Sequence, residues 1–504
     1  MFFGCKRGAV ISIAFFLCAL PWLFFQLRYA VGGDVAFLSM AAQHVLAGER
    51  MIDAYFDNNP PMSYLIYIPA VLLSKTGIPL WYSDNIYIFF ILGASLALTA
   101  IYLRAWPKLD PAFYWSFLAG YFVSQTVMAQ HMFGMKDNLL AMVLVPFLLA
   151  QFLRTLYQTS SWSQRAVFLM GVPFILLKPQ YMLLPAALLI HRVVKEKRWT
   201  IVFDFDFLTV AGWVIAYGLI IAFRFPDFLE EALKPIVVLY TSSIGPDFFP
   251  EMWLLLFSFG AIFLLACAGT RENISARYVV LFLSGLYALA LFGFVIQGKG
   301  VAVHLLPLTV FLFPGIFLTA LLYIPTYIDR YQLSFATVLG IFCLGYHSFL
   351  PDTTYPTHES IKNTFWARYI HEHAGKPGDS FYIEERSPEV VNPLALYMGV
   401  PLASRFSCLW FLHGMERMAK EGTPARERDY WRGIFSRYMA QDISRFKPAF
   451  VALPKNVAPE ADVLKIFKTE PSFRREWSHY QKKGVGQTSY KSHIVLYDIY
   501  HRTQ

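Results

Sequence analysis

The stretch AVISIAFFLCALPWLFF, residues 9–25, is followed a few residues later by GGD at residues 32–34. The apolar run has the length that a helix needs to cross a bilayer, so the chain reaches a membrane surface just before Asp34. An amphipathic stretch comes next, and then Asp57-Asn58-Asn59-Pro60-Pro61. This order predicts a carboxylate held at a membrane face, beside a short surface helix and a proline turn, where it would act on a lipid-linked substrate.

The composition extends the membrane prediction to most of the chain. Its 504 residues are 56% hydrophobic and only 15% charged, whereas a soluble globular protein carries about 25% charged residues. Apolar runs near the spanning length recur through the first two thirds of the sequence. The expected spans are residues 9–29, 82–103, 112–130, 138–156, 165–178, 179–194, 206–224, 252–269, 277–296, 302–322 and 332–348.

Two of these runs, 165–178 and 179–194, are short and adjoin at Lys178-Pro179. Proline breaks a helix, so we expect two short helices that meet at one membrane face. The total is about eleven spans.

The distribution of Lys and Arg predicts the orientation. With a cytoplasmic N-terminus, basic clusters fall on alternate, inner connections, as the positive-inside rule requires. These are Lys6 and Arg7, Arg104 and Lys108, Arg154 and Arg165, Arg192 to Arg198, Arg271 and Arg277, and Arg330. An odd number of spans then places the C-terminal tail outside.

The tail differs in composition from the rest. Residues 349–504 carry 22 Lys and Arg and 17 Asp and Glu, about half of the charged residues of the chain. Strands are expected at 380–384, 449–453 and 494–498, and helices at 428–445 and 460–472. The predicted fold class is mainly α: a polytopic membrane protein with about 11 transmembrane helices and a C-terminal extramembrane α/β domain. Its domains are 1–348, with an outer loop at about 32–80, and 349–504.

Other classes of function fit poorly. The charge of +9 follows the membrane topology and forms no basic stripe with interleaved aromatic residues, which argues against nucleic-acid binding. Among the five cysteines only Cys408 lies in the tail, so a disulfide framework is not expected there.

Polar side chains gather at the outer ends of the expected helices. Ionisable groups near a bilayer are costly and usually mark a site. The set comprises Asp34, residues 57–61, residues 130–138 with Lys136 and Asp137, Lys178, Lys299 and His304.

These residues suit sugar transfer from a polyprenyl phosphate. The phosphate leaving group needs its charge neutralised rather than a proton, which lysines at helix ends can supply. The attacking hydroxyl needs a general base, for which we select Asp34. The expected catalytic residues are Asp34 and Asp137, and the expected substrate-binding residues are Asp57, Asn59, Lys136, Lys178, Lys299 and His304. The simpler alternative is that Asp34 and Asp137 only cap helices.

In its order of features the chain resembles the GT-C superfamily of membrane glycosyltransferases, including protein O-mannosyltransferases and the lipid A aminoarabinose transferase. Gly33-Asp34 matches the first-loop acid of that group, and residues 59–64 (NPPMSY) resemble its Lys-Pro-Pro-Leu-x-x-Tyr/Trp turn. Asp137 falls where the group often keeps a second acid, and Leu177-Lys178-Pro179 resembles its short-helix hinge. The resemblance covers about residues 9–320. Two residues depart from the pattern, Val35 in place of a second acid and Asn59 in place of the lysine.

The resemblance implies an inverting glycosyltransferase that moves a hexose or pentose from a polyprenyl-phosphate donor to a lipid, glycan or protein acceptor on the outer face. It implies a bacterial inner-membrane protein of cell-envelope glycan biosynthesis, with the tail in the periplasm. No cofactor is required, although a divalent metal at Asp34 and Asp137 stays open. The alternative function is a transporter or flippase of a lipid-linked saccharide, and a non-catalytic scaffold is a third class. Transporters tend to show internal repeats, and none is evident in the sequence.

Overall fold

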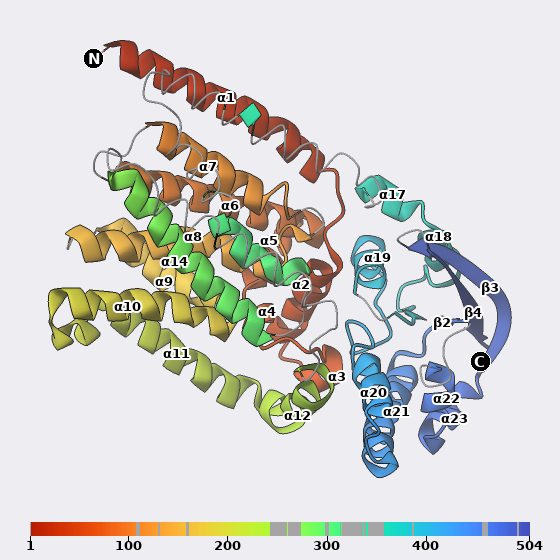
Figure 1. Ribbon diagram of the computed structural model, residues 1–504. Coiled ribbons are helices and arrows are strands. Elements are labelled where there is room, and N and C mark those ends of the chain that lie inside the picture. The colour runs from red at the N-terminus through yellow and green to blue at the C-terminus, as the bar shows by residue number, and fades with distance from the viewer. Residues whose placement is uncertain are drawn as a thin grey trace. The chain divides into compact units, whose positions relative to one another are not determined.

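A computed structural model of the chain describes residues 2–106, 111–129, 132–157, 161–241, 274–297, 302–312, 357–385, 388–455, 462–490 and 493–503, with residues 260, 314, 336, 339 and 340. Helices dominate, and the described strands all belong to the C-terminal part (Figure 1). The chain divides into two compact units. The first is Met1–Arg28, Asn85–Gly218 and Ile244–Thr353, and the second is Tyr29–Asp84, Leu219–Ser243 and Thr354–Gln504.

Apolar helices form the first unit. They are α1 (Phe2–Gln26), α6 (Leu80–Arg104), α7 (Pro111–Gln125), α8 (Lys136–Tyr157), α9 (Trp162–Ile175), α10 (Leu183–Glu196), α11 (Phe205–Arg224) and α14 (Ile274–Gln297). The first residues of α6, up to Asp84, and the last of α11, from Leu219, belong to the second unit. Aromatic side chains pack between them: the Trp22 ring lies 5.1 Å from that of Phe133 and 5.8 Å from that of Phe122. Helix α8 is enclosed by its neighbours: 78% of its most apolar 18-residue stretch is buried. It therefore forms the centre of this unit.

Within the described residues, three helices are long and apolar enough to cross a membrane, judged by length and composition: Leu80–Arg104, Lys136–Leu156 and Phe205–Arg224. Shorter apolar helices cover Val10–Phe24, Met62–Ser74 and Phe282–Gln297. The expected count of about eleven spans is therefore not confirmed. The expected spans at 252–269 and 332–348 lie almost wholly outside the described residues.

The break expected at Lys178-Pro179 is confirmed. Helix α9 starts with a capping box between Ser161 and Gln164 and ends at Ile175. A 3₁₀ helix, η2 (Pro179–Met182), then leads into α10. Proline is favoured at the first position of a helix because its missing N–H would have no partner there. Lys178 thus lies at the junction of two 14-residue helices.

Short helices follow α1 in the chain and belong to the second unit. They are α2 (Gly33–Leu46), α3 (Met51–Ala54), α4 (Met62–Leu65) and α5 (Ile68–Ser74). Helix α2 buries small and apolar side chains and packs against both α4 and α5. Two π-helical segments, η4 (Phe228–Ala232) and η5 (Ile236–Thr241), flank α12 (Leu233–Pro235) in the same unit.

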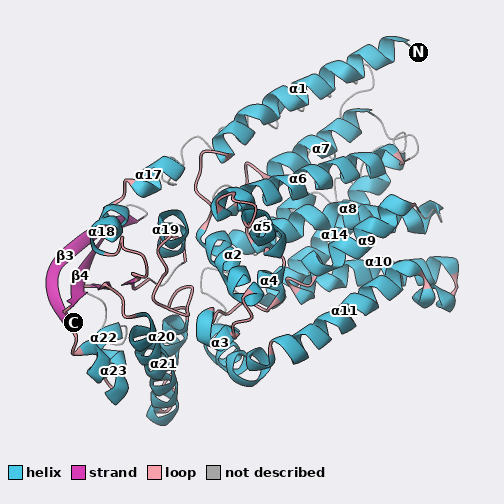
Figure 2. Cartoon of the chain, turned by 180° about the vertical axis from the view of Figure 1, so that it is seen from behind, coloured by secondary structure: helices cyan, strands magenta, loops and turns pink. Residues whose placement is uncertain are grey.

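The tail contains a four-stranded sheet of order β1-β2-β4-β3. Its strands are β1 (Phe381–Ile383), β2 (Phe450–Pro454), β3 (Tyr480–Tyr490) and β4 (His493–Arg502). Strands β1 and β2 are parallel, and the other pairs are antiparallel. Figure 2 shows the two long strands β3 and β4 side by side. The three expected strands are confirmed as β1, β2 and β4. Strand β3 was not expected because YQKKGVGQTSY is polar and contains two glycines.

The helices of the tail precede β1 or lie between the strands in the sequence. They are α17 (His358–Lys362), α18 (Phe365–His373), α19 (Val391–Met398), α20 (Phe411–Lys420), α21 (Ala425–Phe446), α22 (Val463–Phe467) and α23 (Pro471–Trp477). The expected helix at 428–445 is α21. The one expected at 460–472 is wrong as a single helix, since Pro471 cannot continue a helix and instead starts α23. The domain boundary expected near residue 348 stays a prediction; the second compact unit also includes residues 29–84 and 219–243.

Candidate functional site

A lysine, an aspartate and a histidine from separate segments meet inside the first unit. Lys178 Nζ lies 2.5 Å from Asp137 Oδ1 and 2.6 Å from His304 Nδ1, and it donates a 3.2 Å hydrogen bond to Gln297 Oε1. Asp137 is fully buried, and Lys178 and His304 are each 6% exposed. We call these four residues the hinge cluster. Three of them were expected site residues, and the structure brings those three together.

The ammonium group determines the protonation of its neighbours. A lysine has three N–H donors and no acceptor, and Lys178 faces three acceptors. For Nδ1 of His304 to accept a hydrogen bond, the ring proton must be on Nε2, an assignment inferred from the hydrogen-bond pattern. His304 Nδ1 and Asp137 Oδ1, which lie 3.2 Å apart, then both accept hydrogen bonds from the Lys178 ammonium group. His304 consequently has a donor at Nε2.

Further polar groups border the hinge cluster. Lys136 is 8% exposed and interacts electrostatically with both Asp137 and His304. Tyr181 is buried and interacts with Asp137 in the same way. Among the described residues, neither Asp137 Oδ2 nor the Tyr181 hydroxyl has a hydrogen-bond partner. Buried polar atoms are almost always satisfied, so these two atoms are unusual within the described residues.

The turn before α8 places Asp137. Gly134 adopts a φ of 81°, a conformation that favours glycine. Its N–H donates to Asn138 Oδ1 at 2.9 Å, and Asn138 Nδ2 donates to the Gln125 carbonyl at 3.1 Å. Helix α8 then starts at Lys136, so Asp137 lies in its first turn, where the helix dipole favours a negative charge.

Asp34 lies in the second unit, in the first turn of α2. The N-cap of this helix is Gly32, which has no side chain to make a capping hydrogen bond. The alternative that Asp34 serves as the N-cap is therefore wrong. Asp34 is half-buried, and the dipole of α2 favours its charge. The preceding Gly33 has no room for a side chain, because an added Cβ would lie 2.1 Å from the Pro388 carbonyl oxygen.

Asp57 is a buried carboxylate in the same unit, with 2% of its surface exposed. Asn59 Nδ2 donates to Asp57 Oδ2, and Ser407 Oγ donates to Asp57 Oδ1 at 2.7 Å. The Tyr64 hydroxyl donates to the Asn59 carbonyl at 3.0 Å, which fixes the proline turn before α4. Both expected residues of this turn therefore have defined positions.

The expected site residues thus form two groups, one in each compact unit. Asp34, Asp57 and Asn59 belong to the second unit, and Lys136, Asp137, Lys178 and His304 belong to the first. Lys299 lies outside the described residues. The structure shows the contact between Asp137 and Lys178. The expected single cavity, lined by these two residues together with Asp34 and Lys299, stays a prediction.

Three side chains near these groups had no assigned role in the sequence analysis: Gln297, Tyr181 and Ser407. A signal existed for Gln297, which precedes Gly298-Lys299-Gly300, and for Tyr181, which follows the Lys178 hinge by three residues. Ser407 offered none, since its partner Asp57 is 350 positions away.

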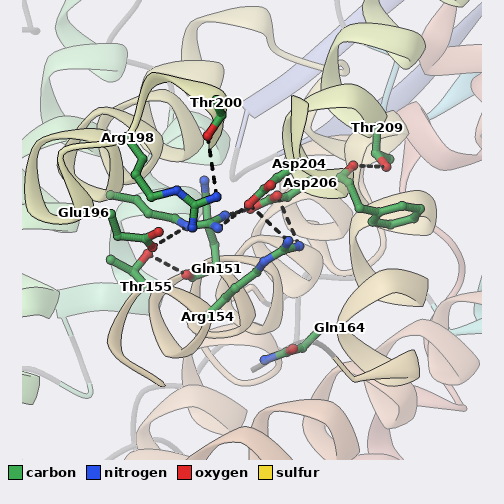
Figure 3. Close-up of polar contacts among 12 residues, drawn as sticks. Gln151, Arg154, Thr155, Gln164, Glu196, Arg198, Thr200, Asp204, Asp206 and Thr209 are labelled. Carbon is green, nitrogen blue, oxygen red and sulfur yellow. Dashed lines mark hydrogen bonds and ion pairs between the residues drawn. The ribbon is translucent and has the colours of Figure 1, made fainter. Parts of the chain in front are cut away.

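A second buried charge cluster occupies the other end of α8 (Figure 3). Arg192 pairs with Asp206 at 2.9 Å, with Glu196 at 2.9 Å and with Asp204. Arg154 pairs with Asp206 at 3.1 Å and with Asp204 at 3.4 Å. We call these five residues the arginine cluster. They join the ends of α8 and α10 to the start of α11, which indicates a structural role.

Metal binding finds no support in the described part of the chain. No group of three or more His, Cys, Asp or Glu side chains there is arranged to hold a metal ion. The divalent metal at Asp34 and Asp137 that the sequence leaves open stays a prediction.

Comparison with known proteins identifies the fold. No protein-family model matches the sequence, and no curated protein matches it significantly. Solved structures do match. The crystal structure of ArnT from Cupriavidus metallidurans bound to undecaprenyl phosphate has a TM-score of 0.52 and 12% identity, over 98% of this chain and 97% of that one. The chain has the fold of ArnT.

A second crystal structure, of the same ArnT in the apo state, gives a TM-score of 0.54 and 12% identity over 96% of this chain and 97% of that one. ArnT is a GT-C enzyme, so the resemblance to the GT-C group is confirmed at the level of the fold. The likeness includes the tail, which the sequence-based resemblance left out.

Proposed function

We propose that this protein is an inverting membrane glycosyltransferase that transfers a sugar from a polyprenyl-phosphate donor to an acceptor on the outer membrane face. The observation that carries this proposal is the likeness, over nearly the whole of both chains, to ArnT bound to undecaprenyl phosphate. The proposed location is a bacterial inner membrane with the tail in the periplasm. The proposed acceptor is a lipid, glycan or protein, and the donor sugar is a hexose or pentose.

Asp34 is the proposed general base. Its carboxylate would accept the proton of the acceptor hydroxyl as that oxygen attacks the anomeric carbon. The half-buried position of Asp34 in the first turn of α2 supports this role. The bond from the anomeric carbon to the phosphate oxygen breaks as the new glycosidic bond forms on the opposite face.

The hinge cluster is the proposed site of the departing phosphate. Together with the bordering Lys136, the hinge cluster places two cations beside Asp137, which is the one carboxylate that the described residues supply there, so the local charge favours an anion. Lys178 directs three N–H bonds at protein acceptors, and a phosphate would have to replace one of them. Among the described residues the hydrogen bonds of His304 involve Nδ1, so its Nε2–H requires no such exchange with them, which makes His304 the better first donor. Lys299 is the further proposed cation.

Asp57 and Asn59 are proposed to bind substrate, and Asp137 to orient the cations around the phosphate. We propose that no cofactor is required. A phosphate leaving group departs without protonation, and positioned cations can stabilise its charge.

The test uses purified protein in lipid nanodiscs with a polyprenyl-phosphate sugar and an extract of envelope lipids and glycans. We expect glycosylated product together with an equal amount of free polyprenyl phosphate. A transporter or flippase would move the donor between leaflets of proteoliposomes and release no polyprenyl phosphate. Donor movement without release would contradict the proposal.

A further inference from the structure

Tail residues hold the backbone of the outer loop that carries Asp57. Arg405 Nη1 donates to the Ile52 carbonyl at 2.8 Å, and Arg445 Nη1 donates to the Asp53 carbonyl at 2.8 Å. Phe56 forms an isolated parallel β-bridge with Phe406, and their rings lie 5.4 Å apart. All of these residues belong to the second compact unit. The loop therefore takes its conformation from residues some 350 positions away.

The tail segment that makes these contacts is itself fixed. Arg405 is 3% exposed, and its N–H and Nε both donate to the Asp442 carboxylate, at 3.0 and 2.8 Å. Arg405 Nη2 donates to Gln441 Oε1 at 3.0 Å. Three guanidinium nitrogens thus have separate acceptors, Asp442 for Nε, Gln441 for Nη2 and the Ile52 carbonyl for Nη1, which gives the side chain a single orientation. Because Asp442 and Gln441 lie on α21, that helix anchors the segment leading to Ser407.

Ser407 completes the support of Asp57. Its hydroxyl donates to Asp57 Oδ1 at 2.7 Å, while Asn59 donates to the other oxygen. Hydrogen bonds to a buried carboxylate favour its ionised form and fix its direction. The neighbouring Cys408 interacts electrostatically with Asp57, Asp34 and Glu385, and burial raises the pKa of its thiol. Asp57 and Asp34 thus share a neighbour that stays uncharged.

The same part of the tail also meets the start of α2. The Pro388 carbonyl occupies the place where a Gly33 side chain would be, and Gly33 N–H donates to Glu389 Oε2 at 3.4 Å. Two tail segments, one at Pro388-Glu389 and one at Arg405–Cys408, therefore contact the chain beside Asp34 and beside Asp57. A shift of the tail would move both acids.

We infer that Ser407 is a positioning residue for Asp57, and that the tail forms a wall of the reaction site rather than an appended domain. The inference rests on the proposed function for its catalytic consequence. Ser407 does not touch the reacting atoms; it orients Asp57, a carboxylate that is proposed to bind substrate.

The test compares Ser407→Ala with Ser407→Thr, which keeps the hydroxyl, and with the matched control Ser436→Ala. Ser436 is another buried tail serine, and its hydroxyl donates to the Ile466 carbonyl at 3.2 Å. The variants are studied as full chains in nanodiscs. Hydrogen–deuterium exchange of residues 52–62 is measured first, because it does not depend on activity. We expect faster exchange there in Ser407→Ala alone.

Turnover is measured second. A lost hydrogen bond to a charged group predicts a fall in kcat of roughly tenfold for Ser407→Ala, with the affinity for undecaprenyl phosphate unchanged. Ser407→Thr should retain most of kcat, and Ser436→Ala all of it. Unchanged exchange in Ser407→Ala would overturn the inference. So would equal kcat losses in Ser407→Ala and Ser407→Thr. If the wild-type protein transfers no sugar, the proposed function fails, and the exchange result still decides whether Ser407 holds the loop.

Discussion

Helix α8 has a buried charge cluster near each end, and the two clusters are built from different cations. The hinge cluster at Asp137 uses a lysine beside a histidine, whereas the arginine cluster at Arg154 uses two guanidinium groups. Seventeen residues of helix separate Asp137 from Arg154, or about 26 Å at the standard rise. If α8 crosses the bilayer, the clusters therefore lie at opposite membrane faces.

The difference in cation indicates a difference in role. Guanidinium is planar and permanently charged, and it holds several carboxylate oxygens in a fixed geometry. An ammonium group is a compact charge that exchanges partners readily, and imidazole changes its protonation near neutral pH. In the arginine cluster, three carboxylates pair with two guanidinium groups. In the hinge cluster, two lysines lie near one carboxylate, so the local charge attracts an anion. The arginine cluster therefore suits a structural role, and the hinge cluster suits a ligand site.

Arg192→Met should give the largest effect. It leaves Asp206 and Glu196 buried with less compensation, and breaking a buried pair typically costs about 3–5 kcal/mol of unfolding free energy. Thermal unfolding in nanodiscs measures the loss. The control Arg198→Met removes an exposed arginine that contacts Thr200 at 3.5 Å, and it should change stability little. The Arg192→Met protein that remains folded should bind undecaprenyl phosphate as tightly as the wild type does. A loss of affinity in this folded protein would contradict the structural role of the arginine cluster.

Lys178→Met should reduce both stability and carrier binding. Loss of a charge-assisted contact predicts roughly 100-fold weaker binding of undecaprenyl phosphate, because such contacts contribute up to about 3 kcal/mol. The double variant Lys178→Met/Asp137→Asn removes the unpaired charge and should recover stability without recovering binding. Recovery of binding in the double variant would show that the hinge cluster has only a structural role, as the arginine cluster does.

His304 offers a finer distinction within the hinge cluster. Asn retains an acceptor near the position of Nδ1, and Gln retains a donor near the position of Nε2. We expect His304→Asn to keep the melting temperature but to bind undecaprenyl phosphate roughly tenfold less tightly, as expected for one lost hydrogen bond. His304→Gln should lose stability instead and bind better than His304→Asn. Equal effects of the two substitutions would contradict the assigned tautomer.

Glu385 provides a smaller contrast, since it belongs to neither cluster and its charged neighbours are the acids Glu384 and Glu389. Burial raises the pKa of Glu385 to about 8, although the Val391 and Val390 N–H groups oppose the rise. Between an unfolded pKa near 4.5 and about 8, the folded state binds more protons, so stability should fall as pH rises through this window. Glu385→Gln should flatten that decline in denaturation curves; an unaltered slope would assign the pH dependence to other groups.

The sequence predicted those parts of the molecule that depend on local signals. Hydropathy located α6, α8 and α11, and proline at 179 located the hinge. The apolar strands of the tail were also recognisable, whereas β3 takes its strand form from pairing with β4 and has no apolar alternation of its own.

The candidate site was predictable in part for the same reason. Asp137, Lys178 and His304 could be grouped because each is a polar residue at the end of an apolar helix. Their mutual contacts, with one ammonium satisfying three acceptors, required coordinates. The support of Asp57 by Ser407 was beyond the sequence, because a serine in a polar tail gives no local sign of a partner in the first outer loop.

Sugar transfer by Asp34→Asn is the most direct test of the proposed transferase. The substitution preserves the size of the side chain and removes the basic oxygen, so kcat should fall roughly 10²–10⁴-fold while affinity for undecaprenyl phosphate is unchanged. Asp53→Asn is the matched control, since Asp53 lies in the same loop with half of its side chain exposed and pairs with Arg50 at 3.8 Å. It should transfer sugar at the wild-type rate. Release of polyprenyl phosphate by Asp34→Asn at the rate of Asp53→Asn would contradict the account.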